Sequence, residues 1–261
     1  MSSIFPAVFL GHGSPMNAIE TNAYTQAWRA IGEQLGKPRA IVSISAHWYL
    51  GATAVTVGPK PRTIHDFGGF PPELYQVQYP APGDDALGTR LAELLAPVPV
   101  TPEVSWGLDH GTWSVLRHMY PKADVPIVQL SLDATQPASF HHALGRALSP
   151  LRSERVLILG SGNVVHNLGV YSWDRGPRAP YDWAIRFERV VRETIGAGDH
   201  QPLVDYERLG ADASWSVPTP EHYLPLLYVL GSRQADEPAT FPVSGIEGGS
   251  ISMLAVQLGA T

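Results

Sequence analysis

Four histidines of this chain stand at or just beyond the ends of short apolar segments, a position in which imidazoles can bind a metal ion. His12 follows AVFLG, His47 follows AIVSISA, and His166 closes RVLILGSGNVVH. His222 lies at the start of the apolar run in PTPEHYLPLLYVL. In an open α/β sheet, ligands bind outside the carboxyl ends of the strands, where distant parts of the chain converge. The placement of these histidines therefore predicts a metal site.

Strands alternating with helices are expected to position the histidines. Apolar β-branched runs without polar alternation, typical of strands buried on both faces, occupy residues 7–10, 40–45, 54–57, 126–130 and 156–159. Helical patterns occupy residues 22–35, 84–95, 113–119, 137–151, 181–195 and 221–230. Residues 250–258 fit a late strand, although so short an apolar run is also compatible with a helix. We predict an α/β fold, a single domain over residues 1–261, with a central mainly parallel or mixed β-sheet covered by helices on both faces.

Composition and charge exclude several classes of site and partner. The chain has no cysteine, so any metal must be held by His, Asp or Glu. The formal net charge is −6 and the basic residues are scattered, whereas nucleic-acid binding normally needs a basic cluster. No apolar stretch is long enough to cross a bilayer, and the N-terminal segment lacks the features of a signal peptide. We expect a cytoplasmic protein that binds neither nucleic acid nor membrane, and the oligomeric state stays open.

An irregular segment at residues 58–82 is rich in Pro, Gly and aromatic residues. Long irregular segments inside a compact domain are usually functional loops or disordered, and the aromatic content here favours order. We expect this segment to form a wall or lid over the site. Aromatic candidates for the pocket lining are Phe67, Phe70, Trp173 and Trp183.

The remaining histidines fall into two groups. His65–Asp66 and Asp109–His110 are neighbours in Gly-rich aromatic loops. Adjacent residues seldom point the same way, so we do not interpret either dipeptide as a hydrogen-bonded dyad. Both loop-stabilising contacts and substrate recognition or proton transfer stay open for these residues. Helical or turn contexts with ordinary polar neighbours assign the other four to the surface: His118, His141, His142 and His200.

Six motifs occur in one order along almost the whole chain: GHGSPMN (11–17), SAHW (45–48), TIHDFGGFP (63–71), GLDHGTW (107–113), SGNVVHN (161–167) and PTPEHYLPLLYVLG (218–231). Together they resemble the class III extradiol ring-cleavage dioxygenases, in particular the 4,5-DOPA extradiol dioxygenase-like branch. The resemblance implies a non-haem metal centre that binds a small aromatic diol. With O2, this centre would open the ring beside the two hydroxyls to give a muconic semialdehyde.

The same resemblance implies a ligand set. His12, His47 and His222 would hold the metal. Better known members such as protocatechuate 4,5-dioxygenase resemble a two-His, one-Glu triad, whereas this motif places His222 next to Glu221. Imidazole ligands serve zinc, iron or copper. We expect Fe(II) for activity, and Zn²⁺ in the same site after purification, because zinc can occupy such a site but lacks redox chemistry.

Further roles follow from the motifs. His166 would be an acid–base residue near the metal, or a fourth ligand, and His110 a catalytic group on the substrate side. Substrate contacts are expected from His65, Asp66 and Tyr223.

Two other functions remain possible from the residues alone. A zinc-dependent hydrolase could use a His-rich site to activate water, although the chain lacks HExxH. A non-enzymatic zinc-binding protein is the second, although structural zinc sites are usually closed and thiolate-rich. Ser14 and Ser161 do not fit the G-x-S-x-G elbow of serine hydrolases, and Gly160 and Gly162 supply only part of a dinucleotide-binding motif.

Overall fold

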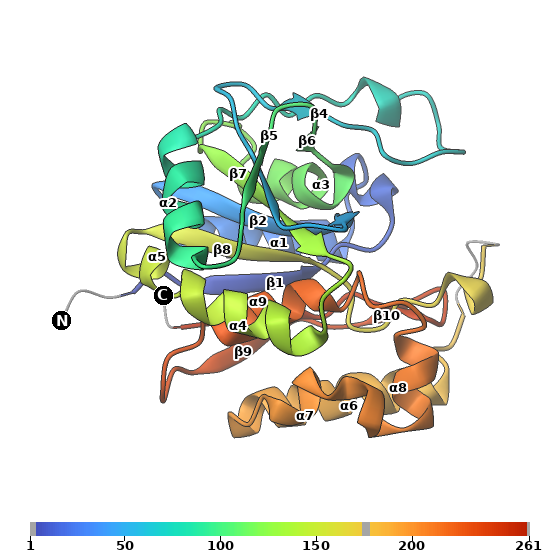
Figure 1. Cartoon of the computed structure of the whole chain (residues 1–261). Coiled ribbons are helices and arrows are strands. Elements are labelled where there is room, and N and C mark those ends of the chain that lie inside the picture. The colour runs from blue at the N-terminus through green and yellow to red at the C-terminus, as the bar shows by residue number, and fades with distance from the viewer. Residues whose placement is uncertain (1–3, 174–177, 260–261) are drawn as a thin grey trace.

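A mixed eight-stranded sheet forms the centre of the protein, in the order β5-β3-β7-β2-β8-β1-β12-β9 (Figure 1). The computed structural model describes residues 4–173 and 178–259. The strands are β1 (Ala7–Gly11), β2 (Ala40–Leu50), β3 (Ala54–Thr56), β5 (Thr101–Glu103), β7 (Ile127–Asp133), β8 (Val156–Gly162), β9 (Ala239–Val243) and β12 (Ala255–Leu258). The central strands β7, β2, β8 and β1 run parallel, whereas β12 pairs antiparallel with β1 and β9 pairs antiparallel with β12. The predicted α/β fold with a mixed sheet is confirmed.

Helices cover both faces of this sheet (Figure 1). Helices α1 (Ala23–Leu35) and α3 (His110–Met119) pack on one face. The hydrophobic cluster of the other face includes α2 (Asp85–Leu95), α4 (Ala138–Leu148), α5 (Pro150–Ser153), α6 (Asp182–Ala197), α7 (Gln201–Val204), α8 (Ala211–Ser216) and α9 (Leu224–Gly231). Successive residues of β1 alternate between the clusters, with Val8 in the first and Phe9 in the second. Burial on both faces explains why the central strands are continuously apolar.

Short elements complete the chain. Two pairs of two-residue strands form small separate sheets: β4 (Arg62–Thr63) with β6 (Gly107–Leu108), and β10 (Ile246–Glu247) with β11 (Ile251–Ser252). The 3-10 helices are η1 (Pro15–Ala18), η2 (Leu74–Gln76), η3 (Leu168–Val170) and η4 (Tyr206–Leu209). None of the described helices has the length and apolar character needed to span a membrane.

Several boundaries differ from the sequence-based expectation. Helix α3 begins three residues early, at His110, because the Asp109 side chain accepts a hydrogen bond from the Thr112 backbone N–H at 3.1 Å. Strand β2 continues past its apolar run, so that His47 lies inside the strand, where the pairing with β7 changes register. Helix α9 starts only at Leu224, which leaves His222 in the loop before it.

The assignment of His141 to the surface is wrong. Its side chain is fully buried under α9, and its Nδ1 lies 3.2 Å from the Tyr228 hydroxyl. Helical periodicity places this residue on the inner face of α4, which its polar type conceals. The other three histidines of that group are half-buried: His118, His142 and His200.

A buried ion pair ties the chain together at the end of the sheet where the parallel strands begin. Arg152 is fully buried and pairs with Glu237, which is 7% exposed. The guanidinium also donates to the carbonyls of Phe5 at 2.8 Å and Ser232 at 2.9 Å. The pair therefore links the segments before β1 and before β9 to the end of α5.

Replacing Arg152 by Met is expected to destabilise the protein by about 3–5 kcal/mol, because Glu237 becomes a buried charge without a partner. Urea denaturation measures this loss. The exposed Arg186–Asp212 pair provides the control, since Arg186→Met removes an ion pair that water already screens. Equal losses of unfolding free energy in the two variants would contradict a special contribution of the buried Arg152–Glu237 pair.

Candidate metal centre and pocket

The carboxyl ends of the parallel strands bring three predicted ligands together. His12 directly follows β1, His47 lies near the end of β2, and His222 precedes α9. Strand β8 lies between β1 and β2, so the three side chains meet above its end. The ring centroids of His12 and His47 are 5.0 Å apart. The centroid of His222 lies 5.4 Å from that of His12 and 5.1 Å from that of His47. One ring nitrogen from each lies within 4.8 Å of the others, close enough to share one ion.

Gly162, the last residue of β8, makes this convergence possible. Its carbonyl accepts a hydrogen bond from the His12 backbone N–H at 3.0 Å, and the next residue, Asn163, donates to the His222 carbonyl at 2.8 Å. A Cβ on Gly162 would overlap the His222 carbonyl. The close approach of these two backbones therefore requires a glycine.

Oxygen atoms face the Nδ1 atom of each of the three rings. Ser161 donates its hydroxyl proton to the Gly111 carbonyl at 2.5 Å, so its oxygen accepts from His12 Nδ1 at 3.0 Å. His222 Nδ1 lies 3.1 Å from a Glu221 carboxylate oxygen. His47 Nδ1 lies 3.6 Å from Asp66 Oδ2. Ser161 and Glu221 accept from Nδ1 of His12 and His222, which leaves the Nε2 lone pairs of these rings for a metal, and the nearby Asp66 charge favours the same tautomer in His47.

The donor set fits a divalent metal ion. The Nε2 atoms of His12 and His47 lie 3.2 Å apart. With both Nδ1 atoms protonated, two lone pairs face each other, and a cation between them removes the repulsion. Burial first, and the other histidines second, hold the pKa of His12 well below its ordinary value, and those of His47 and His222 are also lowered. The rings are thus neutral near pH 7, the form that binds metal.

Asp66 pairs with His110, although the two residues are far apart in the sequence. Its two carboxylate oxygens accept from the His110 backbone N–H at 2.8 Å and from His110 Nδ1 at 2.9 Å. Burial acts against the charge on Asp66, but the bonds from His110 outweigh it and lower the pKa of the carboxyl. The Asp of one dipeptide thus orients the His of the other, a pairing that the sequence did not indicate.

Asp109 points the opposite way, into the protein, and has a structural function. It is fully buried and accepts hydrogen bonds from the Ser45 hydroxyl at 2.7 Å and from the Gln129 amide. Burial, followed by the nearby Asp66 charge, raises its pKa to about 6. These bonds join β2, β7 and the start of α3 below His47 and His110.

His166 lies against the ligand cluster without a polar partner of its own. Its ring stacks on His222 with 3.4 Å between the centroids and 6° between the planes. No described residue hydrogen-bonds to either ring nitrogen. Burial, and then the proximity of His222, lowers its pKa to about 3. The ring is therefore neutral near pH 7 and free to accept a proton from a ligand.

A cavity of about 520 Å³ opens above these histidines, within the range of small-molecule sites. The 58–82 segment contributes Asp66 and residues 67–70 to its wall, as expected, so Phe67 and Phe70 face the cavity. Apolar side chains that line the remainder are Leu168, Tyr171, Trp173 and Ile251. Trp183 does not line the cavity but stacks on Tyr181.

Two residues expected to contact the substrate lie outside this cavity. His65 turns away, and its Nε2 lies 3.0 Å from the Val77 carbonyl. Tyr223 is fully buried, and its hydroxyl donates to the Leu203 carbonyl at 2.9 Å. Adjacency to His222 suggested a site position, but the backbone at the start of α9 directs Tyr223 into the core.

Three contributors were not expected from the sequence. Ser161 orients His12, Glu221 orients His222, and Glu247 lines the cavity. Ser161 could have been found from its place at the carboxyl end of the β8 apolar run. Glu247 carries no such signal, because it reaches the site through the β10–β11 pair.

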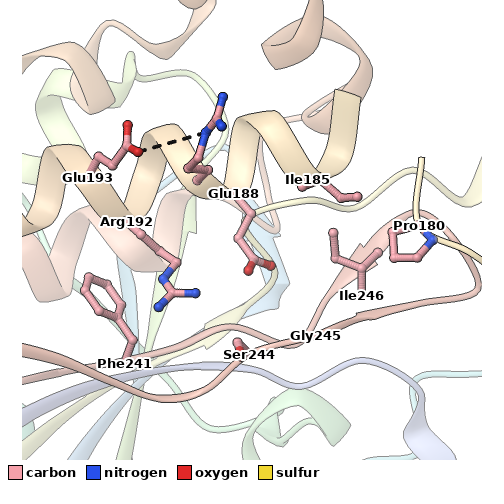
Figure 2. Close-up of a pocket in the computed structure, with 10 residues that line it drawn as sticks. Pro180, Ile185, Glu188, Arg192, Glu193, Phe241, Ser244, Gly245 and Ile246 are labelled. Atoms are coloured by element: carbon pink, nitrogen blue, oxygen red, sulfur yellow. Dashed lines mark ion pairs between the residues drawn. The ribbon is translucent and has the colours of Figure 1, made fainter. Parts of the chain in front are cut away.

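A second cavity, of about 570 Å³, lies between α6 and the segment that leads from β9 to β10 (Figure 2). Arg189 forms an ion pair with Glu193 at 3.9 Å on its rim, and Arg192 lies over the Phe241 ring at 5.1 Å. None of the residues that line it is a histidine. The metal-binding groups therefore belong to the first cavity.

Comparison with known proteins agrees with this geometry. A family model described as the catalytic LigB subunit of aromatic ring-opening dioxygenase matches residues 5–243. A 4,5-DOPA dioxygenase extradiol of Escherichia coli (strain K12) is 53% identical over 263 residues, with 99% of this chain and 96% of that protein covered. A 4,5-DOPA dioxygenase extradiol of Beta vulgaris is 37% identical over 254 residues, covering 94% and 92%. The crystal structure of an uncharacterized protein of Escherichia coli K12 has a TM-score of 0.85 at 49% identity, covering 98% of this chain and 100% of that one.

Gly162→Ala is expected to weaken binding of a divalent metal by roughly 10- to 100-fold, because the added methyl displaces the His222 backbone. Titration with Zn²⁺ against a competing chelator measures the affinity. Gly196→Ala is the matched control, since a Cβ at that exposed position meets no atom within 4 Å. Unchanged affinity in the Gly162 variant would show that the close backbone approach is unnecessary.

The metal-free protein is expected to lose stability as the pH falls below 6.5. The pKa of His12, His47 and His222 is below the ordinary 6.5 in the folded state, so the unfolded chain binds protons that the folded chain excludes. The Glu221 carboxyl, with a pKa lowered to about 2, contributes only in stronger acid. Melting temperatures at pH 7.5 and 5.5 test this. The decrease in melting temperature between the two pH values is expected to be smaller for His47→Gln. Equal melting temperatures of the unmodified chain at both pH values would contradict it.

Proposed function

Since this chain belongs to the LigB family of aromatic ring-opening dioxygenases and is an extradiol ring-cleavage dioxygenase, we propose that it opens a small catechol with O2 at the histidine cluster. In this proposal His12, His47 and His222 hold Fe(II), and Zn²⁺ occupies the same ligands after purification. The substrate is DOPA-like or another small catechol, and the product is a muconic semialdehyde. The names of the relatives from Escherichia coli and Beta vulgaris support the DOPA-like choice.

One observation carries the proposal most directly. One ring nitrogen from each of His12, His47 and His222 lies within 4.8 Å of the others, and all three residues line a cavity that aromatic side chains also line. Bound Fe(II) would supply redox chemistry with O2 and lower the pKa of the catechol hydroxyls. Zn²⁺ would fill the same ligands without redox chemistry. The family membership favours this function over the zinc hydrolase and the non-enzymatic zinc protein.

His166 is the proposed proton acceptor for a catechol hydroxyl. It lines the cavity, and its ring nitrogens have no described protein partner. Its low pKa keeps the ring neutral before the substrate binds. The negative charge of a catecholate beside the ring raises that pKa, so the proton can be held and later returned.

His110 is the proposed second group on the substrate side. Asp66 fixes the proton on His110 Nδ1 and thereby leaves Nε2 as the acceptor. The same carboxylate also lies 3.6 Å from His47 Nδ1, so one acidic side chain adjoins both a proposed ligand and a substrate-side group. Phe67 and Phe70 line the cavity and offer an apolar surface to an aromatic ring.

Anaerobic reconstitution with Fe(II), followed by a panel of catechols, tests the activity. We expect oxygen uptake in step with the absorbance of a ring-opened product. His12→Ala and His47→Ala are expected to lose bound metal, because each removes one ligand of three. His166→Ala is expected to retain the metal and to lower kcat by about 10²- to 10⁴-fold. Turnover of a hydrolysable ester without oxygen uptake would favour the hydrolase instead.

Asp66→Asn is expected to lower kcat more than it weakens Fe(II) binding, because the amide no longer fixes the tautomer of His110, whereas His47 Nδ1 lies 3.6 Å from Asp66, beyond hydrogen-bond distance. The expected decrease in kcat is roughly 10-fold or more. The comparison variant is Asp124→Asn, at an exposed carboxylate that pairs with Lys37 and lies outside the cavity. Unchanged kcat in the Asp66 variant would exclude an orienting function.

A further inference from the structure

Glu247 is a carboxylate in the cavity wall that the proposed chemistry does not use. Among the described lining residues, the only acidic side chains are Asp66 and Glu247, and none is a lysine or arginine. The Asp66 carboxylate already accepts a hydrogen bond from His110 Nδ1. Glu247 is half-buried, and no hydrogen bond or ion pair joins its carboxylate to a described residue. Among the described lining residues, the cavity therefore contains one available acidic group and no lysine or arginine.

Backbone pairing holds Glu247 on the side of the pocket next to His166. In the β10–β11 pair Glu247 stands opposite Ile251, and Ile251 also forms a β-bridge with His166. The turn between the two strands is closed by a hydrogen bond from the Ser250 backbone N–H to the Glu247 carbonyl at 3.1 Å. Three adjacent segments thus hold the backbone of Glu247 close to that of His166, the proposed base.

Helix α6 supports this pair from behind. Figure 2 shows Glu188 extending from α6 toward the segment that carries Gly245 and Ile246. The Ser252 hydroxyl of β11 donates to Glu188 at 2.6 Å, inside the protein. Glu188 is thereby occupied and does not face the catechol cavity. The supporting bond keeps the strand pair in place while the Glu247 side chain remains free.

The electrostatic environment of Glu247 favours a cation. Burial, and then the nearby Glu20, raises the pKa of this carboxyl. A positive group beside it would relieve both effects. Arg178 lines a neighbouring groove with Glu247, but its guanidinium donates to the Tyr181 hydroxyl at 2.6 Å and stacks over that ring. The described residues therefore offer no cation that neutralises Glu247 within the pocket.

We propose that Glu247 is a specificity-determining residue that selects catechols with a cationic amine on the side chain over catechol carboxylates. The ammonium group donates hydrogen bonds to the Glu247 carboxylate while the two hydroxyls face the histidine cluster. A carboxylate side chain is repelled by Glu247 and is disfavoured, since no described lining residue is a lysine or arginine that could compensate. This selection rests on the proposed ring-opening activity at the same cavity.

Three catechols of similar size and different charge test the selection in the Fe(II)-loaded enzyme: dopamine (cationic), dihydroxyphenylacetate (anionic) and ethylcatechol (neutral). We expect kcat/KM to be highest for dopamine and lowest for dihydroxyphenylacetate. Glu247→Gln is expected to lower kcat/KM for dopamine about tenfold, as for the loss of one charge-assisted hydrogen bond. The same variant should leave ethylcatechol within about twofold, because a neutral side chain makes no ionic contact. Glu247→Lys is expected to reverse the order of the two charged substrates.

Glu33→Gln is the matched control, because Glu33 is exposed on α1 and lines neither the catechol cavity nor the neighbouring groove. It should leave the order of the three substrates unchanged. If Glu247→Gln lowers kcat/KM equally for all three substrates, or for none, the selection is wrong even though the enzyme is active. If the unmodified enzyme turns over none of them, including ethylcatechol, the ring-opening function itself fails. Melting temperatures of both variants confirm that they are folded.

Discussion

The candidate metal centre depends on one arrangement: each imidazole of the cluster keeps Nδ1 against an oxygen, so that its Nε2 lone pair remains for a shared ion. Ser161, Glu221 and Asp66 supply these oxygens from three different segments. Without them the rings could rotate or change tautomer, and an Nε2–H of one ring could donate to the Nε2 of the other at 3.2 Å, which would leave fewer lone pairs for an ion. The hydrogen bonds around the cluster thus prepare the site before any ion arrives.

Burial gives the same cluster its protonation state. Several imidazoles crowd a space from which water is largely excluded, so a proton on one ring disfavours a proton on the next. A metal ion can replace the excluded protons because it binds several lone pairs at once. The stacked His166 shares this low-proton environment without a fixed partner. His166 can therefore exchange protons with a ligand, whereas the imidazoles of the cluster are held in place by their hydrogen bonds.

The proposed metal ligands and the wall of the cavity come from different parts of the fold. The proposed ligands sit on or beside the ends of rigid, doubly buried strands, whereas the cavity wall comes from the 58–82 segment, the loop after β8 and the β10–β11 pair. Loops and strand pairs of this kind can change in sequence without disturbing the sheet. The wall can therefore set the charge of the preferred side chain, through residues such as Glu247, while the metal centre stays the same.

Sequence patterns alone determined the mixed α/β fold, the family and the histidines expected at the strand ends, because apolar runs and glycine-flanked histidines are local features. Tertiary structure decided which side chains meet and which way each one points, which local sequence patterns do not predict. Asp66 joins His110 rather than its neighbour, Tyr223 turns into the core, and Glu247 reaches the cavity across a short strand pair. The physical reason is that side-chain direction depends on backbone geometry and packing. Hydrogen-bond partners far apart in the chain therefore become neighbours only when the sheet has formed.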